Sequence, residues 1–135
     1  EDKLKEQVLF YGLKRVFFEG FKNPKQYYER ASILLLTSEY EGFPLVLVEC
    51  MCFGVVPVVY ASYPAINDII HNDINGKIVE PVNDKFVTNN MVVPISQVMI
   101  DEDFRDILAK NAIQTVANNY SINTIYKQWI NKFNS

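Results

Sequence analysis

The sequence of 135 residues has no long apolar run and no strongly basic segment, and it contains only two cysteines and one histidine. Its apolar runs fall short of the roughly 18 residues that a membrane-crossing helix needs. The N-terminal residues EDKLKEQ lack the apolar core of a secretory signal peptide. With a formal net charge of -3 and Lys14-Arg15 as its longest basic cluster, the chain has too few clustered cations to neutralise phosphates. We therefore expect a soluble, cytoplasmic protein that binds no nucleic acid.

The scarcity of cysteine and histidine limits both disulfides and metal sites. Cys50 and Cys52 are two residues apart in a predicted helix, where their side chains point about 200° apart and cannot be joined. Both are therefore expected as free thiols, as in a reducing compartment. His71 adds a single ligand to these thiols, which is too few for a structural zinc. We predict neither a metal site nor a cofactor.

The length and the hydrophobic content of 49% predict one domain with one core. The apolar patterns predict helices at about 3–13, 25–31, 44–53, 64–71, 101–117 and 121–133, and strands at 16–18, 33–36, 55–60 and 76–79. Short apolar strands alternating with helices indicate a parallel sheet in an α/β layer fold. The run Ile33–Leu36 is apolar throughout, so we expect this strand to be covered on both faces. From Asp84 onward the pattern is helical, with a break near Val92-Val93 caused by Pro94.

The stretch SEYEGFPLVLVEC, residues 38–50, places a carboxylate on each side of an almost wholly apolar run. Pro44 is suited to the start of a helix, because its missing N–H would have no partner there. Glu41 then lies in the loop before this helix, and Glu49 lies in its second turn. A carboxylate at the far end of an apolar run needs a partner or a ligand.

The first turn of this helix also offers an anion site. The N–H groups of Leu45, Val46 and Leu47 have no partner within an ideal helix, and the helix dipole favours negative charge there. Two carboxylates that accept hydrogen bonds from hydroxyls, beside such a site, suit a nucleotide diphosphate sugar. Gly42 lets the backbone approach a ligand closely. On spacing alone, a solvated loop acid and a surface helix acid remain an equally simple interpretation.

The motifs together resemble the C-terminal, donor-binding half of retaining glycosyltransferases with the GT-B fold, a group that includes many bacterial lipopolysaccharide, capsule and O-antigen enzymes. The resemblance runs in order through Val16–Gly20 (V-x-F-x-G), Ser38–Pro44 (S-x-x-E-G-F-P), Glu41 to Glu49 (E-x7-E), Glu49–Val59 (E-A-M-A-x-G-x-P-V-V), Asp68–Ile70 and Asn75–Val79.

This resemblance implies a Rossmann-like open parallel sheet flanked by helices, which is the C-terminal half of a GT-B fold. Residues 1–135 would be one nucleotide-sugar-binding domain, a fragment of a longer two-domain enzyme. The first strand of that half, with the Arg and Lys that neutralise the diphosphate, is missing from the sequence. Pro64-Ala65 also replaces the Gly-Gly pair that many members carry before the acid-I-I segment.

The resemblance also implies roles for individual residues. Glu49 would accept hydrogen bonds from the ribose hydroxyls, and Glu41, the candidate catalytic residue, would hold hydroxyls of the donor sugar. The loop at residues 18–20 would form a wall for the base. No residue is assigned as a catalytic base. The other predicted substrate-binding residues are Gly42, Phe43, Pro44, Leu45, Val46, Ser38 and Gly20.

The expected activity is metal-independent hexosyl transfer, with a UDP-sugar as donor, in bacterial surface polysaccharide synthesis. The acceptor would be a lipid-linked or polysaccharide sugar bound by the missing N-terminal domain, which could also associate with the inner face of the membrane. We expect the isolated chain to transfer no sugar. Two alternatives stay open: a noncatalytic α/β binding module, and a nucleotide-sugar epimerase, for which no catalytic acids are found.

Two other patterns have simpler interpretations. Asp101-Glu102-Asp103 has the D-x-D form of metal-binding glycosyltransferases, but these acids open a predicted helix and stabilise its dipole. Most aromatic residues, including Phe17, Phe104 and Trp129, have the spacing of core residues. The exceptions are Tyr27-Tyr28 and Tyr40, which are candidates for contact with a sugar.

Overall fold

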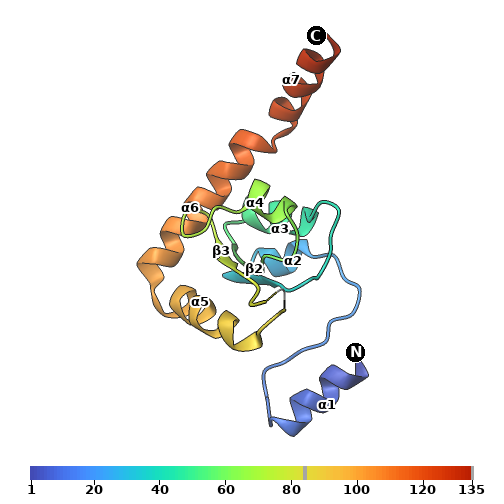
Figure 1. The fold of residues 1–135 in the computed structure, drawn as a ribbon, viewed down its shortest axis with the longest axis vertical. Helices are drawn as coiled ribbons and strands as arrows, with labels where there is room; N and C mark the ends of the chain where they lie inside the picture. Colours follow the sequence, from blue (N-terminus) through green and yellow to red (C-terminus); the bar gives the residue numbers. More distant parts are fainter. Residues whose placement is uncertain (84, 135) are drawn as a thin grey trace.

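The computed structural model describes residues 1–83 and 85–134, which form a small parallel sheet flanked by helices (Figure 1). The sheet contains, in spatial order, β1 (Ile33–Leu36), β2 (Val56–Tyr60) and β3 (Lys77–Val79). Both pairs of neighbouring strands are parallel, and Ile33 lies opposite Val56. The three strands confirm the sequence prediction for this part of the sheet, with boundaries that differ by no more than about one residue.

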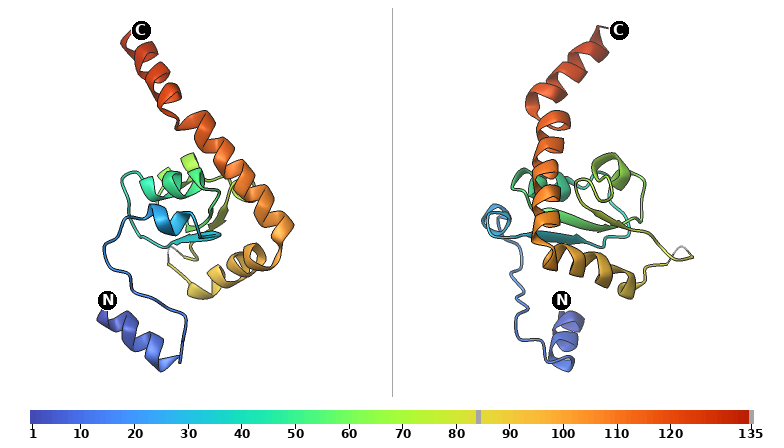
Figure 2. Two further views of the ribbon diagram at one scale, coloured as in Figure 1. Left: turned by 180° about the vertical axis from the view of Figure 1, so that it is seen from behind. Right: turned by 90° about the vertical axis from the view of Figure 1, so that its left-hand side faces the viewer.

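The helices in the described part of the chain are α1 (Asp2–Phe10), α2 (Lys25–Tyr28), α3 (Leu45–Cys52), α4 (Ala65–Ile69), α5 (Thr88–Ile100), α6 (Glu102–Asn119) and α7 (Ile122–Phe133). α3 and α4 pack on one face and α5 on the other, while α6 contributes side chains to both (Figure 1, Figure 2). Each helix that covers the sheet buries one apolar stripe against the strands, which produces the layered α/β fold.

β2 is the centre of the core, because all of its residues are buried. Its side chains alternate between two apolar clusters, as the two-residue period of a strand requires. Val58 packs with Met91 and Leu108 on the side of α5, whereas Val59 packs with Leu47 on the side of α3. Each fully buried aliphatic side chain contributes roughly 1.5–3 kcal/mol. This packing fixes α3 at the end of β1, where the two glutamates lie.

The segment between α1 and α2 does not form the strand predicted at Val16–Phe18. It is an exposed, irregular connection that carries α1 away from the sheet in each view (Figure 2). A strand needs a neighbour that pairs its backbone groups, and no described residue pairs with the outer edge of β1. β1 is therefore an edge strand, and Leu35 is 50% exposed. The exposure of Leu35 shows that one face of β1 is only partly covered, so the prediction that both faces are covered is wrong.

α5 is continuous through Pro94, so the predicted break near Val92-Val93 is also wrong. Proline removes one helical hydrogen bond, a cost that tertiary packing can offset. Met91 and Val98 are both buried, and they hold the helix against the sheet on either side of Pro94. Asp84, where the helical pattern was expected to begin, lies outside the described residues.

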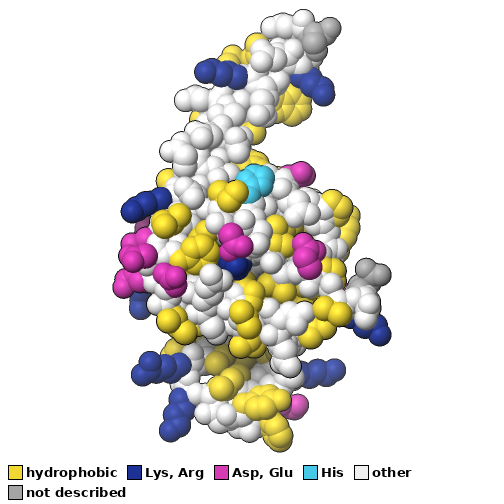
Figure 3. All heavy atoms as spheres, turned by 60° about the vertical axis from the view of Figure 1, so that its left-hand side comes forward, with side chains coloured by type: hydrophobic (Ala, Val, Ile, Leu, Met, Phe, Trp, Pro, Cys, Tyr) yellow, Lys and Arg dark blue, Asp and Glu magenta, His cyan; other side chains and the backbone are white. Residues whose placement is uncertain are grey.

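The two terminal helices differ from the rest, because neither α1 nor α7 contains a buried residue. Figure 3 shows apolar side chains on the exposed surfaces of both. Trp129 is 59% exposed and Phe17 is 76% exposed, so the prediction that they pack in the core is wrong, whereas Phe104 does pack against it. Within the described ranges, no helix is both long enough and apolar enough to span a membrane.

Candidate functional site

The stretch that carries both glutamates joins β1 to α3. Glu41 lies in the loop after β1, and Glu49 lies in the second turn of α3, as the sequence predicted. The loop is fastened to the one after β2, because Ser62 Oγ donates a hydrogen bond of 2.6 Å to the Ser38 carbonyl oxygen. Both loops follow parallel strands, and open parallel sheets bind ligands in the crevice beyond these carboxyl ends.

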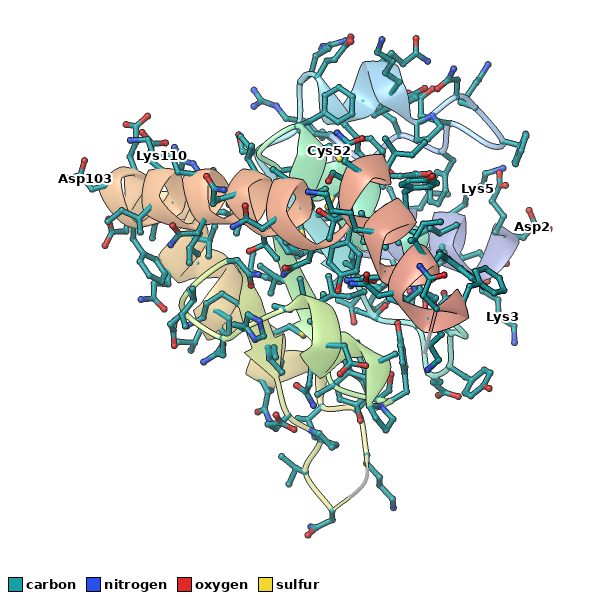
Figure 4. All side chains as sticks on the ribbon, turned by 90° about the horizontal axis from the view of Figure 1, so that it is seen from above. Asp2, Lys3, Lys5, Cys52, Asp103 and Lys110 are labelled. Atoms are coloured by element: carbon teal, nitrogen blue, oxygen red, sulfur yellow. The ribbon has the colours of Figure 1, made fainter. Side chains whose placement is uncertain are left out.

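Glu49 is an exposed carboxylate with one hydrogen-bond donor among the described residues. Tyr28 Oη, from α2, donates to Glu49 Oε2 across 3.4 Å. Beside this pair is a hollow of about 340 Å³ between α2 and α3, which we call the α2–α3 hollow. Figure 4 shows Cys52, the last residue of α3, on the side of α3 that faces the light-blue segment containing α2. The hollow is lined by Asn23, Pro24, Lys25, Tyr28, Glu49, Cys52 and Phe53.

Tyr28 is held in place and keeps its proton. Its side chain is 7% exposed, and its ring centroid lies 5.8 Å from that of Phe53. Burial, followed by the neighbouring charge of Glu49, raises the pKa of Tyr28 to about 12. A hydroxyl with this pKa remains a hydrogen-bond donor throughout the physiological range. Glu49 therefore receives its hydrogen bond from a neutral group.

Glu41 is half-buried and lies near a different tyrosine. Burial, followed by the charge of Glu41, raises the pKa of Tyr63 above its usual value. Tyr63 is also 7% exposed, yet its hydroxyl has no hydrogen-bond partner among the described residues. Its ring centroid lies 6.5 Å from that of Tyr40, one of the tyrosines singled out in the sequence. The carboxylate of Glu41 thus has no fixed donor comparable to Tyr28.

The start of α3 offers fewer free donors than predicted. Leu45 N donates to the Phe43 carbonyl oxygen at 2.8 Å, and Leu47 N donates to the Pro44 carbonyl oxygen at 2.9 Å. Pro44 has φ -78° and ψ 77°, the geometry of an inverse γ-turn, which explains the first of these bonds. Val46 N is the one N–H of the three without a partner among the described residues. The prediction of three free N–H groups is therefore wrong for Leu45 and Leu47.

Three further predicted site residues border this region without forming one compact cluster. A Cβ atom on Gly42 would meet nothing within 4 Å, so the backbone is open there. Phe43 is 47% exposed, and its ring centroid lies 6.0 Å from that of Tyr120, at the junction of α6 and α7. Gly20 has φ +66°, a left-handed conformation that favours glycine, in the loop before α2. That loop is tied to α2 by a hydrogen bond of 2.9 Å from Tyr27 Oη to Glu19 Oε2.

A larger cleft of about 710 Å³ lies at the carboxyl ends of the strands. Glu39, from the loop that carries Glu41, is at one side, and Lys85 is at the other. The remaining lining residues are Tyr60, Ala61, Ser62, Pro81 and Phe86. We call this the strand-end cleft, and its position beside the Glu41 loop allows a polar ligand to extend from that loop across the sheet.

The D-x-D pattern lies away from both hollows. Asp101 caps α6, because its Oδ1 accepts a hydrogen bond of 2.9 Å from Phe104 N. Figure 4 shows Asp103 and Lys110 directed outward from α6, away from α3. Among the residues that the structure describes, no group of three or more His, Cys, Asp or Glu side chains could hold a metal ion. The structure thus supports the helix-capping interpretation of Asp101.

The sequence did not identify Tyr28 and Tyr63 as neighbours of the two glutamates. Tyr27-Tyr28 was predicted to be an exception to core packing, and this prediction is wrong for Tyr28, which is buried in the core cluster. Tyr28 precedes Glu49 by 21 positions in the chain, and no short motif links residues so far apart. The Tyr63 contact depends on where the loop after β2 turns, which local patterns do not determine.

Comparison with known proteins gives consistent results. A relative from Methanocaldococcus jannaschii, named an uncharacterized glycosyltransferase, is 32% identical over 122 residues, covering 88% of this chain and 30% of the relative. A second relative, from Campylobacter jejuni, is 30% identical over 128 residues, which cover 95% of this chain and 34% of the relative. It is named GalNAc-α-(1->4)-GalNAc-α-(1->3)-diNAcBac-PP-undecaprenol α-1,4-N-acetyl-D-galactosaminyltransferase. Among solved structures, the chain superposes on a crystal structure of a TarM variant from S. aureus with a TM-score of 0.81 at 27% identity. The match covers 100% of this chain and 27% of TarM, whose crystal structure is a complex with Fondaparinux, α-GlcNAc-glycerol and UDP.

The fold is that of a C-terminal domain of a glycosyltransferase with the GT-B architecture. Residues 1–115 match the family described as Glycosyl transferases group 1, and the chain belongs to this family. Family membership agrees with the resemblance inferred from the sequence motifs, and it argues against the epimerase alternative. The chain spans about a third or less of the length of the relatives named above.

Proposed function

We propose that this chain is the donor-binding domain of a retaining glycosyltransferase that uses a UDP-sugar. The observation that carries the proposal is the placement of Glu49, an exposed carboxylate that lines the α2–α3 hollow with one oxygen held by Tyr28. Such a carboxylate is suited to accept hydrogen bonds from vicinal hydroxyls, as a ribose presents them. The TarM variant at 27% identity, whose crystal structure contains UDP, supports uridine as the nucleoside.

The chemistry proposed for this domain is electrostatic. The free N–H of Val46 and the positive end of the α3 dipole would stabilise the diphosphate, whose negative charge grows as the glycosidic bond breaks. Glu41, in the loop before α3, would hold hydroxyls of the donor sugar together with the open backbone at Gly42. With two of the three predicted N–H groups engaged, the diphosphate also requires cations from elsewhere. The resemblance to the family implies that an Arg and a Lys supply this charge.

The proposed pathway is the synthesis of bacterial surface polysaccharide. The Campylobacter jejuni relative is named for transfer to an undecaprenol-linked acceptor. By analogy we propose a lipid-linked or polysaccharide sugar as acceptor here, bound by a further domain that could also associate with the membrane. Because no metal-ligand cluster occurs in the described residues, we expect activity of the full-length protein to persist in EDTA. Activity that is lost in EDTA and restored by Mn²⁺ or Mg²⁺ would contradict this expectation.

Calorimetric titration of the protein at its natural length with UDP and a panel of UDP-sugars tests the proposal. We expect saturable binding that Glu49→Gln weakens and that Asp103→Asn leaves within about twofold, since Asp103 is an exposed acid of α6 that lies away from both hollows. Equal affinities of wild type and Glu49→Gln would contradict the assigned site. A protein that binds UDP-sugars but transfers no sugar to any polysaccharide or lipid-linked acceptor would favour the noncatalytic alternative.

A further inference from the structure

The two adjacent tyrosines of α2 each donate a hydrogen bond to a carboxylate on another segment. Tyr27 Oη lies 2.9 Å from Glu19 Oε2, and Tyr28 Oη lies 3.4 Å from Glu49 Oε2. We infer that Tyr28 is a positioning residue that fixes the Glu49 carboxylate in the orientation that binds the ribose. This inference rests on the proposed function of Glu49.

The buried Tyr28 side chain can limit the rotational freedom of the Glu49 side chain. A glutamate on an exposed helix surface populates several rotamers, and restricting it to one of them costs conformational entropy. Tyr28, in contrast, is almost fully buried and packs on Phe53 as part of the cluster that includes Leu47 and Cys50. A hydroxyl on so rigid a side chain can restrict the rotamers of Glu49 before any ligand arrives. Binding then requires less ordering of the protein.

The donor to Glu49 is a neutral side chain. A Lys or Arg in place of Tyr28 would also restrict Glu49, but its positive charge would compete with the ligand hydroxyls for the carboxylate. A phenol that stays protonated donates one hydrogen bond and adds no charge. Tyr28 occupies Oε2, and no described residue donates a hydrogen bond to Oε1. The carboxylate can therefore still accept hydrogen bonds from two neighbouring hydroxyls, since each oxygen has more than one acceptor site.

The hydrogen bond from Tyr28 Oη to Glu49 Oε2 is long. At 3.4 Å the contact is longer than the roughly 2.5–2.7 Å of a strong O–H···O⁻ bond. Tyr28 thus restrains the carboxylate without saturating it. Tyr27 provides an internal comparison, because it comes from the same turn of helix and makes a shorter bond, but its partner Glu19 lies outside the α2–α3 hollow.

The test compares Tyr28→Phe with Tyr126→Phe, a control at an exposed tyrosine of α7 that lines neither hollow, using UDP titrations of the full-length protein. Each change removes one hydroxyl and keeps the ring. We expect Tyr28→Phe to weaken UDP and UDP-sugar binding equally, by about 3- to 10-fold, because both ligands contain the ribose. Tyr126→Phe should change affinity by less than about twofold. In steady-state assays, Tyr28→Phe should raise KM for the donor and leave kcat unchanged.

A double-mutant cycle separates positioning from a general loss of stability. If Tyr28 acts through Glu49, Tyr28→Phe should have almost no effect on UDP affinity when combined with Glu49→Gln. Additive losses would overturn the inference while leaving the role of Glu49 intact. A Glu49→Gln protein that binds UDP like wild type would instead overturn the proposed function itself.

A second variant answers the question if Tyr28→Phe does not fold. Glu49→Asp keeps the charge but shortens the side chain by one methylene, so the carboxylate cannot contact both Tyr28 and the ribose. We expect at least about a fivefold loss of UDP affinity. Wild-type affinity in Glu49→Asp would overturn the positioning role.

Discussion

The surroundings of Glu49 and of Glu41 differ although the sequence presents the two acids as one motif. Glu49 lies on a helix, faces the α2–α3 hollow and receives a hydrogen bond from a buried tyrosine. Glu41 lies in a loop near Tyr63, a buried tyrosine whose hydroxyl has no partner in the described part of the chain. One carboxylate is restrained before a ligand binds, and the other is not.

This difference suggests why the two positions would bind different parts of one ligand. The nucleoside diphosphate is common to many donors, and a restrained carboxylate suits an invariant group. The sugar varies between donors, and a loop acid can adjust its position to different hydroxyls. The following predictions test this contrast, beginning with the largest expected effect.

The strongest test compares Glu49→Gln with Glu41→Gln in titrations of UDP and of a UDP-sugar. Replacing a carboxylate with an amide weakens a charge-assisted hydrogen bond by roughly 1.5–3 kcal/mol, or about 10- to 150-fold in affinity. We expect Glu49→Gln to weaken both ligands, and Glu41→Gln to weaken the UDP-sugar while UDP is nearly unchanged. Equal losses for both ligands in both variants would show that the division of roles is wrong.

The two thiols give a test that needs no substitution. Cys52 is exposed and lines the α2–α3 hollow, whereas Cys50 is fully buried. Burial, followed by the proximity of Cys52, raises the pKa of the Cys50 thiol to about 12, which suppresses its reactive thiolate. We expect iodoacetamide to label Cys52 alone, and saturating UDP to slow this labelling by about 5- to 10-fold. Labelling followed by mass spectrometry measures both, and an unchanged rate with UDP would place the nucleotide outside the hollow.

Alkaline unfolding should report on the buried groups of the Glu49 side. In the fold, the pKa values of Cys50 and Tyr28 are raised to about 12, from usual values of 9.0 and 10.0. The folded protein therefore keeps protons that the unfolded chain releases, so their stabilisation is present below pH 9 and is lost as the pH rises toward 12. We expect the free energy of unfolding to fall by several kcal/mol across this window, since each unit of pKa difference corresponds to about 1.4 kcal/mol. Urea unfolding at several pH values should show a shallower fall in Tyr28→Phe.

The smallest expected effect is on the Glu41 side. Tyr63→Phe removes a buried hydroxyl that has no partner among the described residues, so it should leave stability unchanged or raise it by up to about 1 kcal/mol. Tyr28→Phe removes a paired hydroxyl and should lower stability by about 0.5–1.5 kcal/mol. Thermal unfolding of both variants measures the difference. Equal destabilisation would indicate that Tyr63 has a partner after all.

The sequence predicted the core of this domain better than its edges. The strands at β2 and β3 and the helix that carries Glu49 were found because their apolar periods reflect burial against neighbours within the chain. The prediction of a strand at Val16–Phe18 was wrong, because no described residue pairs with this segment. α2 is only one turn long, shorter than its pattern suggested. Phe17 and Trp129 have core-like spacing, yet no described element covers them.

The candidate site was predictable only in part. A helix start at Pro44 places Glu41 before α3 and Glu49 in its second turn, because a helix has a fixed number of residues per turn. The hydrogen bonds at Leu45 and Leu47 depend on the turn at Pro44, and that turn type is not encoded in a simple pattern. The tyrosine neighbours depend on tertiary packing. The roles of the site residues remain predictions that the titrations above examine.

Tyr120 stands at the junction of α6 and α7, where its ring contacts Phe43 and its hydroxyl donates to the Asp68 carbonyl oxygen at 3.0 Å. α7 extends beyond this junction for 12 residues, or about 18 Å at 1.5 Å per residue. A rotation of α7 about this junction would pivot at a point that contacts the loop of Glu41. A tilt of about 10° would move its far end by about 3 Å but shift Phe43 only slightly. Large displacements at the far end of α7 would therefore reach the loop that carries Glu41 as small adjustments.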